Sequence, residues 1–189
     1  MKPLLELRSV TLRRGGRILL EAFNLRLGAG EALHLAGPNG SGKSSLIRLA
    51  AGLLRPERGS VKRADAALAD DVLALDREQP LRDALAFWAG LQRRAGEVNP
   101  ALELVGLADL AAVPVRLLSA GQAKRAALAR VALSGAPLWL LDEPYNALDS
   151  QSSQRLDVMM GRHLADGGAI LLASHGTLAG NWPRLELGA

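Results

Sequence analysis

The sequence predicts an α/β fold with a largely parallel sheet, an antiparallel β subdomain at the N-terminus and a small inserted helical subdomain. Three observations predict this class. Short strand-like runs alternate with helical patterns along the chain. The buried-strand pattern of 31–36 leads directly into a glycine-rich turn and a helix, and the apolar run 138–141 ends in two acidic residues. A length of 189 residues suits one domain with a small inserted lobe.

The order of elements follows from the hydrophobic pattern. Strand-like stretches alternate apolar and polar side chains or are wholly apolar. They are 4–12, 17–20, 22–27, 31–36, 60–63, 71–75, 138–141 and 169–173. Helical stretches are 43–51, most of 80–113, 117–134 and one to about 165 that Asp149 or Ser150 caps. We expect the core with its β subdomain over 1–75 and 117–189, and the helical subdomain over 76–116.

Composition excludes several classes of protein. No apolar run reaches the roughly 18 to 20 residues that span a bilayer, and charges interrupt the N-terminus before a signal-peptide core can form. We therefore expect a soluble, unexported chain. The absence of Cys excludes disulfides and thiolate metal sites. The formal net charge is +4, but the Arg residues are spread along the chain, which favours a solvated surface over nucleic-acid binding. A basic face near anionic lipid headgroups stays open.

The first chemical motif fits G-x-x-x-x-G-K-[ST] in full. It comprises Gly37, Pro38, Asn39, Gly40, Ser41, Gly42, Lys43 and Ser44, with Ser45 following in the helix. Glycines let backbone N–H groups close around phosphate oxygens, and the helix N-terminus adds its positive dipole end. Lys43 can reach the β- and γ-phosphates, and the Ser44 hydroxyl can ligate Mg²⁺. A glycine-rich turn that binds nothing is the alternative, but the strand before it and the helix after it favour a nucleotide site.

The second motif is the apolar run 138–141 followed by Asp142 and Glu143. It predicts a buried strand with carboxylates at its C-terminal end, where sites lie in open α/β sheets. Asp142 would hold Mg²⁺, and Glu143 would polarise the attacking water as general base. Acidic residues often follow strands, so the motif gains its meaning from the phosphate-binding motif upstream.

The third motif, Leu118-Ser119-Ala120-Gly121-Gln122, opens a predicted helix. It resembles the LSGGQ signature of ABC ATPases, with Ala120 in place of a glycine. Ser119 and the Gly121 backbone would stand at a helix N-terminus, which favours anions. An ordinary helix cap would explain the pentapeptide alone, but its place between the other two motifs favours the family.

Two further segments follow in the order of that family. Asn146-Ala147-Leu148-Asp149 resembles the D-loop, and His175, after 169–173, resembles the switch histidine that contacts the γ-phosphate. The resemblance covers nearly the whole chain and implies a P-loop NTPase core that hydrolyses ATP with Mg²⁺. It also implies that two copies meet head to tail. Each ATP would lie between the P-loop of one copy and the signature of the other, which comprises Ser119, Ala120, Gly121 and Gln122, so that a homodimer completes two sites.

The sequence departs from the family pattern in two places. The family usually has an aromatic residue upstream of the P-loop that stacks on adenine, but here Leu12-Arg13-Arg14 has none. An Arg guanidinium could stack instead, and base specificity is therefore open. Gln79 is the natural candidate for the Q-loop residue and a further Mg²⁺ ligand, although its neighbours are not those of the family.

Within the family, the chain resembles the haem exporter ATP-binding subunits of cytochrome c maturation. The carrying segments are 52–56, 85–88, 118–130 and 138–144, together with the short length. This likeness implies a peripheral subunit on the cytoplasmic face of the bacterial inner membrane, docked on integral membrane permease subunits. We expect no nucleic acid and no directly bound haem, since the sequence has no haem-attachment motif. The alternatives are an ATPase subunit for another transported substrate, a soluble ABC ATPase outside transport, and a nucleotide-binding module that no longer hydrolyses.

Overall fold

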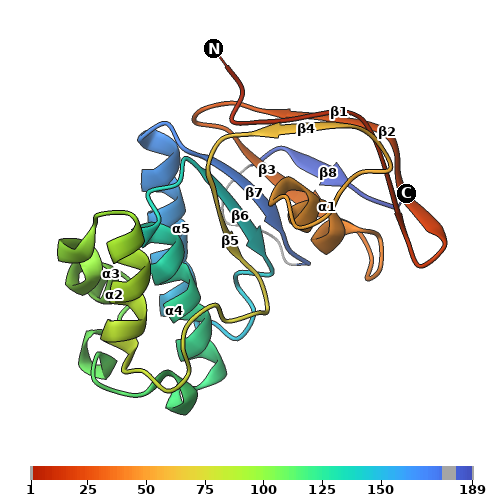
Figure 1. Cartoon of the computed structure of the whole chain (residues 1–189). Coiled ribbons are helices and arrows are strands. Elements are labelled where there is room, and N and C mark those ends of the chain that lie inside the picture. The colour runs from red at the N-terminus through yellow and green to blue at the C-terminus, as the bar shows by residue number, and fades with distance from the viewer. Residues whose placement is uncertain (1, 176–181, 189) are drawn as a thin grey trace. The chain divides into compact units, whose positions relative to one another are not determined.

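The computed structural model describes residues 2–175 and 182–188, without the side chain of Ala95. The chain begins with an antiparallel sheet of three strands (Figure 1). In it β1 (Leu5–Arg14) lies between β2 (Arg17–Leu27) and β4 (Arg58–Arg63). Side chains alternate along β1, so that Leu5 and Leu7 are buried while Glu6 and Arg8 face away from the core.

The second sheet has five strands in the order β5-β6-β7-β3-β8. The strands are β3 (Ala32–Ala36), β5 (Ala66–Ala69), β6 (Leu138–Asp142), β7 (Ala169–Ala173) and β8 (Arg184–Glu186). The pairs β6–β7, β7–β3 and β3–β8 are parallel. Every residue of β6 and β7 is buried, as expected of central strands in a parallel sheet. The predicted α/β class with a largely parallel sheet is confirmed.

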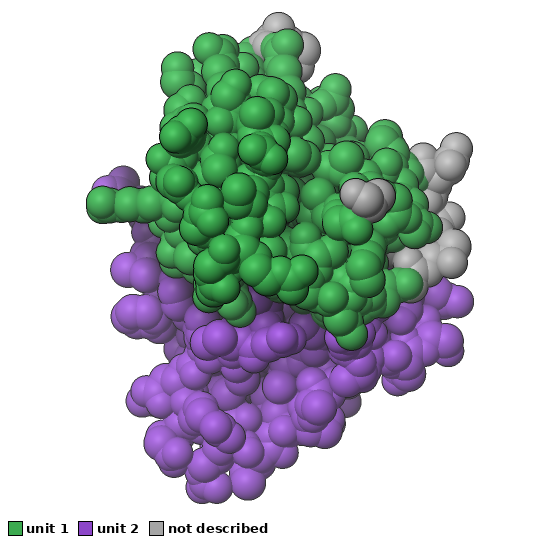
Figure 2. Space-filling view, turned by 90° about the vertical axis from the view of Figure 1, so that its right-hand side faces the viewer, with its two compact units in different colours: residues 1–68, 136–143, 162–189 green, residues 69–135, 144–161 purple. Residues whose placement is uncertain are grey.

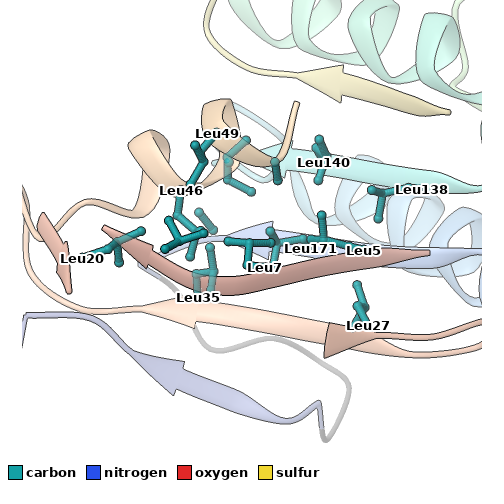
Figure 3. Packing of buried hydrophobic residues seen from close by; sticks show 14 of the residues in the cluster. Leu5, Leu7, Leu20, Leu27, Leu35, Leu46, Leu49, Leu138, Leu140 and Leu171 are labelled. Atoms are coloured by element: carbon teal, nitrogen blue, oxygen red, sulfur yellow. The ribbon is translucent and has the colours of Figure 1, made fainter. Parts of the chain in front are cut away.

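One apolar core joins the antiparallel sheet to α1 (Lys43–Ala50) and the parallel sheet. Leucines of β1, β3, α1, β6 and β7 lie together in it (Figure 3). The cluster contains Leu5, Leu7, Leu35, Leu46, Leu138, Leu140 and Leu171, each at most 1% exposed. Replacing one such leucine by alanine typically costs about 2–5 kcal/mol. The core therefore anchors both the strand before the P-loop and the helix after it.

The remaining helices follow the predicted order. They are α2 (Leu81–Leu91), α3 (Val98–Leu104), α4 (Ala120–Leu133) and α5 (Ser150–Ala165), with single 3₁₀ turns at Ala95–Glu97, Ala108–Leu110 and Val115–Leu117. Among the residues described, no helix combines the length and hydropathy that crossing a membrane requires.

The chain forms two compact units, coloured separately in Figure 2. Unit 1 contains 1–68, 136–143 and 162–189, and unit 2 contains 69–135 and 144–161. Unit 1 holds the apolar core and most of both sheets, and unit 2 holds α2, α3, α4 and most of α5. The expected helical subdomain over 76–116 stays a prediction.

Three strand predictions were wrong in detail. Residues 71–75 form no strand, and the short strand lies at Ala66–Ala69 instead. Its four residues are mostly alanine, which has low β propensity, so pairing in the sheet outweighs the local preference. The stretches 17–20 and 22–27 form one strand, β2, that continues through Ala22 at φ 44°. The three-residue strand β8 was not predicted because it is too short to show a period.

Candidate active site

The glycine-rich turn of 37–44 connects β3 to α1 with the backbone geometry that a phosphate cradle needs. Gly37, Gly40 and Gly42 have φ values of 130°, 79° and 105°. Gly42 is the N-cap of α1 and has no side-chain cap, so the first N–H groups of the helix face the turn. A Cβ at Gly37 would clash with the carbonyl oxygen of Leu187. Glycine is therefore required at this position by the packing as well as by φ.

Lys43 lies across the turn and is only 6% exposed. Its Nζ donates to the carbonyl oxygens of Gly37, at 2.7 Å, and Pro38, at 3.0 Å. The buried hydroxyl oxygen of Ser41 has no hydrogen-bond partner among the described residues. A buried ammonium group and a hydroxyl without a partner, in a turn that ends at a helix N-terminus, fit an anionic ligand such as a nucleotide phosphate.

The acidic motif follows the central strand β6. Asp142 ends that strand and is 4% exposed. Glu143 comes next with φ at 47°, a left-handed conformation that costs a non-glycine residue energy and is frequent at active sites. Its backbone N–H donates to the Ala173 carbonyl at 2.8 Å, which fixes the residue at the end of the sheet.

The structure brings together Glu143 and His175, which the sequence singled out separately. Their strands β6 and β7 are parallel neighbours, with Asp142 opposite Ala173. The Glu143 Oε1 atom lies 3.3 Å from His175 Nε2, and Glu143 Oε2 accepts a hydrogen bond from the His175 backbone N–H at 3.4 Å. Both groups therefore stand at the carboxyl edge of the sheet, where water and a substrate can reach the half-exposed imidazole.

The signature residues cap α4 in unit 2. Ser119 Oγ accepts from the Gln122 backbone N–H at 3.3 Å, and the Gln122 side chain accepts from the Ser119 N–H at 2.8 Å, a complete capping box. Ala120 is the first residue of the helix. A Cβ at Gly121 would lie 2.6 Å from the carbonyl oxygen of Ala147, so a glycine is needed there for close approach of the two segments.

Asp149 caps α5, as predicted for that residue or Ser150. Its Oδ1 atom accepts from the Ser152 N–H at 2.7 Å. Hydrogen bonds from Ser152 lower the pKa of Asp149, desolvation opposes this shift, and the charges of Arg125 and Arg155 add to it. The expected D-loop residue thus has a structural partner within its own unit.

The candidate Q-loop residue is exposed and also lies in unit 2. The Gln79 carbonyl accepts from the Val115 N–H at 3.0 Å, and the residue lines a hollow of about 570 Å³ with Asp83, Phe87 and Trp88. Because Asp142 belongs to unit 1, Mg²⁺ ligation by Gln79 stays a prediction.

The remaining donors fit Mg²⁺ by their chemistry. Ser44 presents an exposed hydroxyl in the first turn of α1, and Asp142 presents a carboxylate at the end of β6. Magnesium is usually bound through one or two protein oxygens and completes its octahedron with phosphate oxygens and water. A hydroxyl and a carboxylate are the donor types that such a site requires.

The sequence did not identify two contacts that shape the P-loop. The Leu187 N–H donates to the Ala36 carbonyl at 2.9 Å, and a Cβ at Gly188 would lie 2.9 Å from Ser41 Cβ, so the segment after β8 packs on the turn. Leu19 of β2 packs at Gly42. Both contacts join segments far apart in the sequence, and no local pattern signals them.

The stretch Leu12-Arg13-Arg14, which we expect near the nucleotide base, contains two arginines. Hydrogen bonds hold the side chain of one of them. Arg13 Nε donates to Glu57 at 3.1 Å, and its Nη1 donates to the Gly16 carbonyl at 3.3 Å. Arg14 is exposed. Among the described residues, the structure shows no comparable hydrogen bond for the Arg14 guanidinium.

The chain is similar to known proteins over most of its length. The chain matches the family model described as ABC transporter over residues 20–146. The cytochrome c biogenesis ATP-binding export protein CcmA of Novosphingobium aromaticivorans is 58% identical over 171 residues, which are 90% of this chain and 87% of that protein. The protein of the same name from Sphingopyxis alaskensis is 52% identical over 181 residues, 95% of this chain and 93% of that protein.

Solved structures agree on the fold. The structure of an ATP-binding subunit of an ABC transporter superposes with a TM-score of 0.83 at 27% identity, over 91% of this chain and 79% of that one. The ATP-binding cassette MJ0796, described as a dimer in a post-hydrolysis state with ADP and Pi, superposes with a TM-score of 0.86 at 21% identity. That match covers 97% of this chain and 94% of the other, and it shows the fold alone.

Proposed function

Because this chain belongs to the ABC transporter family and, within it, to the cytochrome c biogenesis ATP-binding export proteins, we propose that it drives haem export for cytochrome c maturation. The chain is an ABC ATPase. The observation that carries its role as a motor is the contact between Glu143 and His175 at the carboxyl edge of the sheet. A module that had lost hydrolysis would have no need of this pair.

Binding of ATP begins with an exchange of partners at the P-loop. The Lys43 ammonium leaves the carbonyl oxygens of Gly37 and Pro38 and pairs with the β- and γ-phosphates. Backbone N–H groups of the turn 37–44 and of the start of α1, including Ser45, bind the remaining phosphate oxygens. Ser44 and Asp142 would hold Mg²⁺, with Gln79 as a further ligand, and the ion would neutralise charge on the phosphates.

Hydrolysis requires a base and a γ-phosphate contact. Glu143 accepts a proton from the attacking water, whose oxygen forms a bond to the γ-phosphorus while the bond to the bridging oxygen breaks. The products are ADP and inorganic phosphate. His175, held against Glu143 at 3.3 Å, contacts the γ-phosphate and keeps the carboxylate oriented.

The second half of each site comes from another copy in this proposal. Ser119, Ala120, Gly121 and Gln122 bind the ATP held by the partner's P-loop, and Asp149, the expected D-loop residue, caps α5 in the same unit. The capping box supports this role because it sets the N-terminus of α4, an end that favours phosphate.

Mixing two defective chains tests the shared site. Ser119→Arg blocks closure and Lys43→Ala removes phosphate binding, so each chain alone is inactive. A mixed dimer contains one intact composite site, and some ATPase activity should return. If heterodimers form and the ATPase activity does not return, the head-to-tail arrangement of independent sites is refuted.

The permease partner is the remaining part of the proposal. We place the chain peripherally on the cytoplasmic face of the bacterial inner membrane, bound to integral membrane subunits. The relatives named as export proteins support this, and so do three large apolar side chains that unit 2 exposes at 61–66%: Val72, Phe87 and Leu91. The expected division into a core and a helical subdomain over 76–116 belongs to the same proposal.

Cytochrome c production in a cell that lacks this chain tests the cellular role. The unmutated chain should restore haem-containing cytochrome c, and Lys43→Ala should not. Full maturation without the chain would refute the cytochrome assignment. A purified chain that still hydrolyses ATP would in that case have another substrate or act outside transport.

A further inference from the structure

The strands of the antiparallel sheet, with the segments next to β1 and β4, line a cleft of about 870 Å³, which we call the basic cleft. All ten of its lining residues belong to unit 1. Five of them are cationic and one is acidic, and these six are Lys2, Arg8, Arg26, Lys62, Arg63 and Glu6. The cleft shares no residue with the P-loop, so its chemistry is separate from the ATP site.

Strand pairing fixes the positions of three of these charges. Glu6 of β1 lies opposite Arg26 of β2 on one side and opposite Lys62 of β4 on the other. Directly opposite residues have Cβ atoms about 4.5–5.5 Å apart. Since Leu5 and Leu7 point into the core, Glu6 and its neighbours across the strands point to the other face. Strand pairing therefore places Glu6, Arg26 and Lys62 side by side, and Lys2 joins them from the segment before β1.

The formal charge of the basic cleft equals the formal net charge of the whole chain. The five cations and one carboxylate of the cleft leave a formal charge of +4, which equals the formal net charge of all 189 residues. The rest of the chain is therefore balanced, with His counted as neutral.

The single carboxylate is already engaged. Arg8 Nη2 donates to Glu6 Oε1 at 2.9 Å. This hydrogen bond lowers the pKa of Glu6, desolvation opposes the shift, and the charges of Arg8, Lys62 and Arg26 add to it. Three cations therefore lie around Glu6, Arg8 by this hydrogen bond and Arg26 and Lys62 by strand pairing.

We propose that the basic cleft binds a polyvalent phosphate-bearing anion. Four excess positive charges in one hollow require a ligand with several negative charges, and guanidinium groups bind phosphate oxygens in a bidentate fork while lysines add point charges. The phosphates of anionic lipid headgroups and those of a soluble polyphosphate share this chemistry. The inference goes beyond the proposed ATPase function and does not depend on it.

Two probes separate the sources of the phosphate. Soluble tripolyphosphate is titrated calorimetrically into the Lys43→Ala chain, in which the P-loop cannot compete. Vesicles of phosphatidylglycerol, with phosphatidylcholine vesicles for comparison, are sedimented with the unmutated chain. We expect saturable binding to at least one anionic probe, weakened by added salt.

A matched pair of double variants locates the site. Arg26→Glu with Lys62→Glu reverses two charges inside the cleft, and Arg17→Glu with Arg58→Glu reverses two exposed charges on the same two strands outside it. The cleft variant should bind the anionic probe at least about tenfold more weakly, since two attractive charges become repulsive. The control should keep its affinity.

The proposal is overturned if neither probe binds saturably, or if both double variants lose the same affinity. Should the charge reversals prevent folding, the corresponding Gln substitutions at the same four positions replace them with the same expectation. ATPase activity of the unmutated chain is measured in parallel, so failure of the basic cleft leaves the proposed function untouched.

Discussion

Unit 1 and unit 2 hold their candidate site residues by different kinds of interaction. In unit 1, Glu143 and His175 are placed by the pairing of β6 and β7, and their side chains contact each other across the sheet. In unit 2, Ser119 and Asp149 are held by helix caps, in which each side chain already has a backbone partner. Substitutions in unit 1 should therefore change chemistry with little cost in stability, whereas those in unit 2 should cost stability as well.

The sharpest test on the unit 1 side is Glu143→Gln. The amide keeps the shape of the side chain but cannot accept the proton of water, so ATP hydrolysis should slow at least about a hundredfold. ATP binding should persist, and the chain should accumulate as an ATP-bound dimer, as size-exclusion chromatography would show. Glu103→Gln, on the exposed face of α3, is the control and should leave the rate unchanged. A rate within a few-fold of the unmutated chain would remove Glu143 from the role of base.

Lys43→Ala should abolish the stabilisation of the fold by ATP. A ligand at 100 times its dissociation constant stabilises the folded state by about 2.7 kcal/mol. This ATP-dependent shift in thermal melting should disappear in the variant, because no other side chain in the turn supplies a cation. Arg58→Ala changes an exposed cation outside both the P-loop and the basic cleft and should keep the shift. An unmutated chain with no ATP-dependent shift would contradict the P-loop assignment itself.

The nucleotide site of unit 1 should discriminate only weakly between ATP and GTP. No aromatic residue stands at Leu12-Arg13-Arg14, and Arg13 is tied to Glu57. Stacking of a base on an aromatic side chain is worth roughly 1–3 kcal/mol elsewhere. Without it, GTP should compete with ATP within about tenfold in a displacement assay. A strong preference for ATP would show that another residue, such as Leu19 beside Gly42, contacts the base.

In unit 2, Ser119→Ala should lower the free energy of unfolding of the chain alone, in addition to any effect on ATP hydrolysis. Loss of an N-cap hydroxyl typically destabilises a protein by about 0.5–2 kcal/mol. Urea unfolding should show this loss for the chain alone, whereas Ser119→Asp, which can also cap α4, should restore most of it. If Ser119→Ala unfolds like the unmutated chain, the capping box contributes nothing, and the contrast between the units fails.

Local motifs predicted the candidate site residues, whereas the sequence did not predict the long-range contacts. The run 37–44 and the acids 142–143 carry their chemistry in consecutive residues, so the sequence sufficed to single them out. Glu143 meets His175 because β6 and β7 are neighbours in the sheet. The order of strands along the chain does not specify which strands are neighbours. The strand β5 was misplaced because alanines carry little β preference, and the packing of Gly188 on Ser41 has no local signal.

The smallest expected effect is a pH dependence of stability in unit 1. His163, near the end of α5, stacks on Trp139 of β6 with ring centroids 3.9 Å apart and planes within 9°. Burial lowers the pKa of His163 below its ordinary value of 6.5, against the opposing influence of hydrogen bonds with Ala169 and Pro137 and the charge of Asp166. The unfolded chain therefore binds a proton more readily than the folded chain. The contribution of neutral His163 to stability is fully present above pH 6.5 and is lost as the pH falls through the lowered pKa of this group in the folded state.

Unfolding free energies measured by urea titration between pH 7.5 and pH 5.5 should decline toward acid by a small amount, because the imidazole is only partly buried. His163→Phe keeps a ring to stack on Trp139 and cannot titrate, so its decline should be shallower. The carboxylates contribute little to the slope in this range, since their ordinary pKa values lie near 4. An identical slope in both chains would show that His163 does not cause the decline and would leave the stacked pair as packing alone.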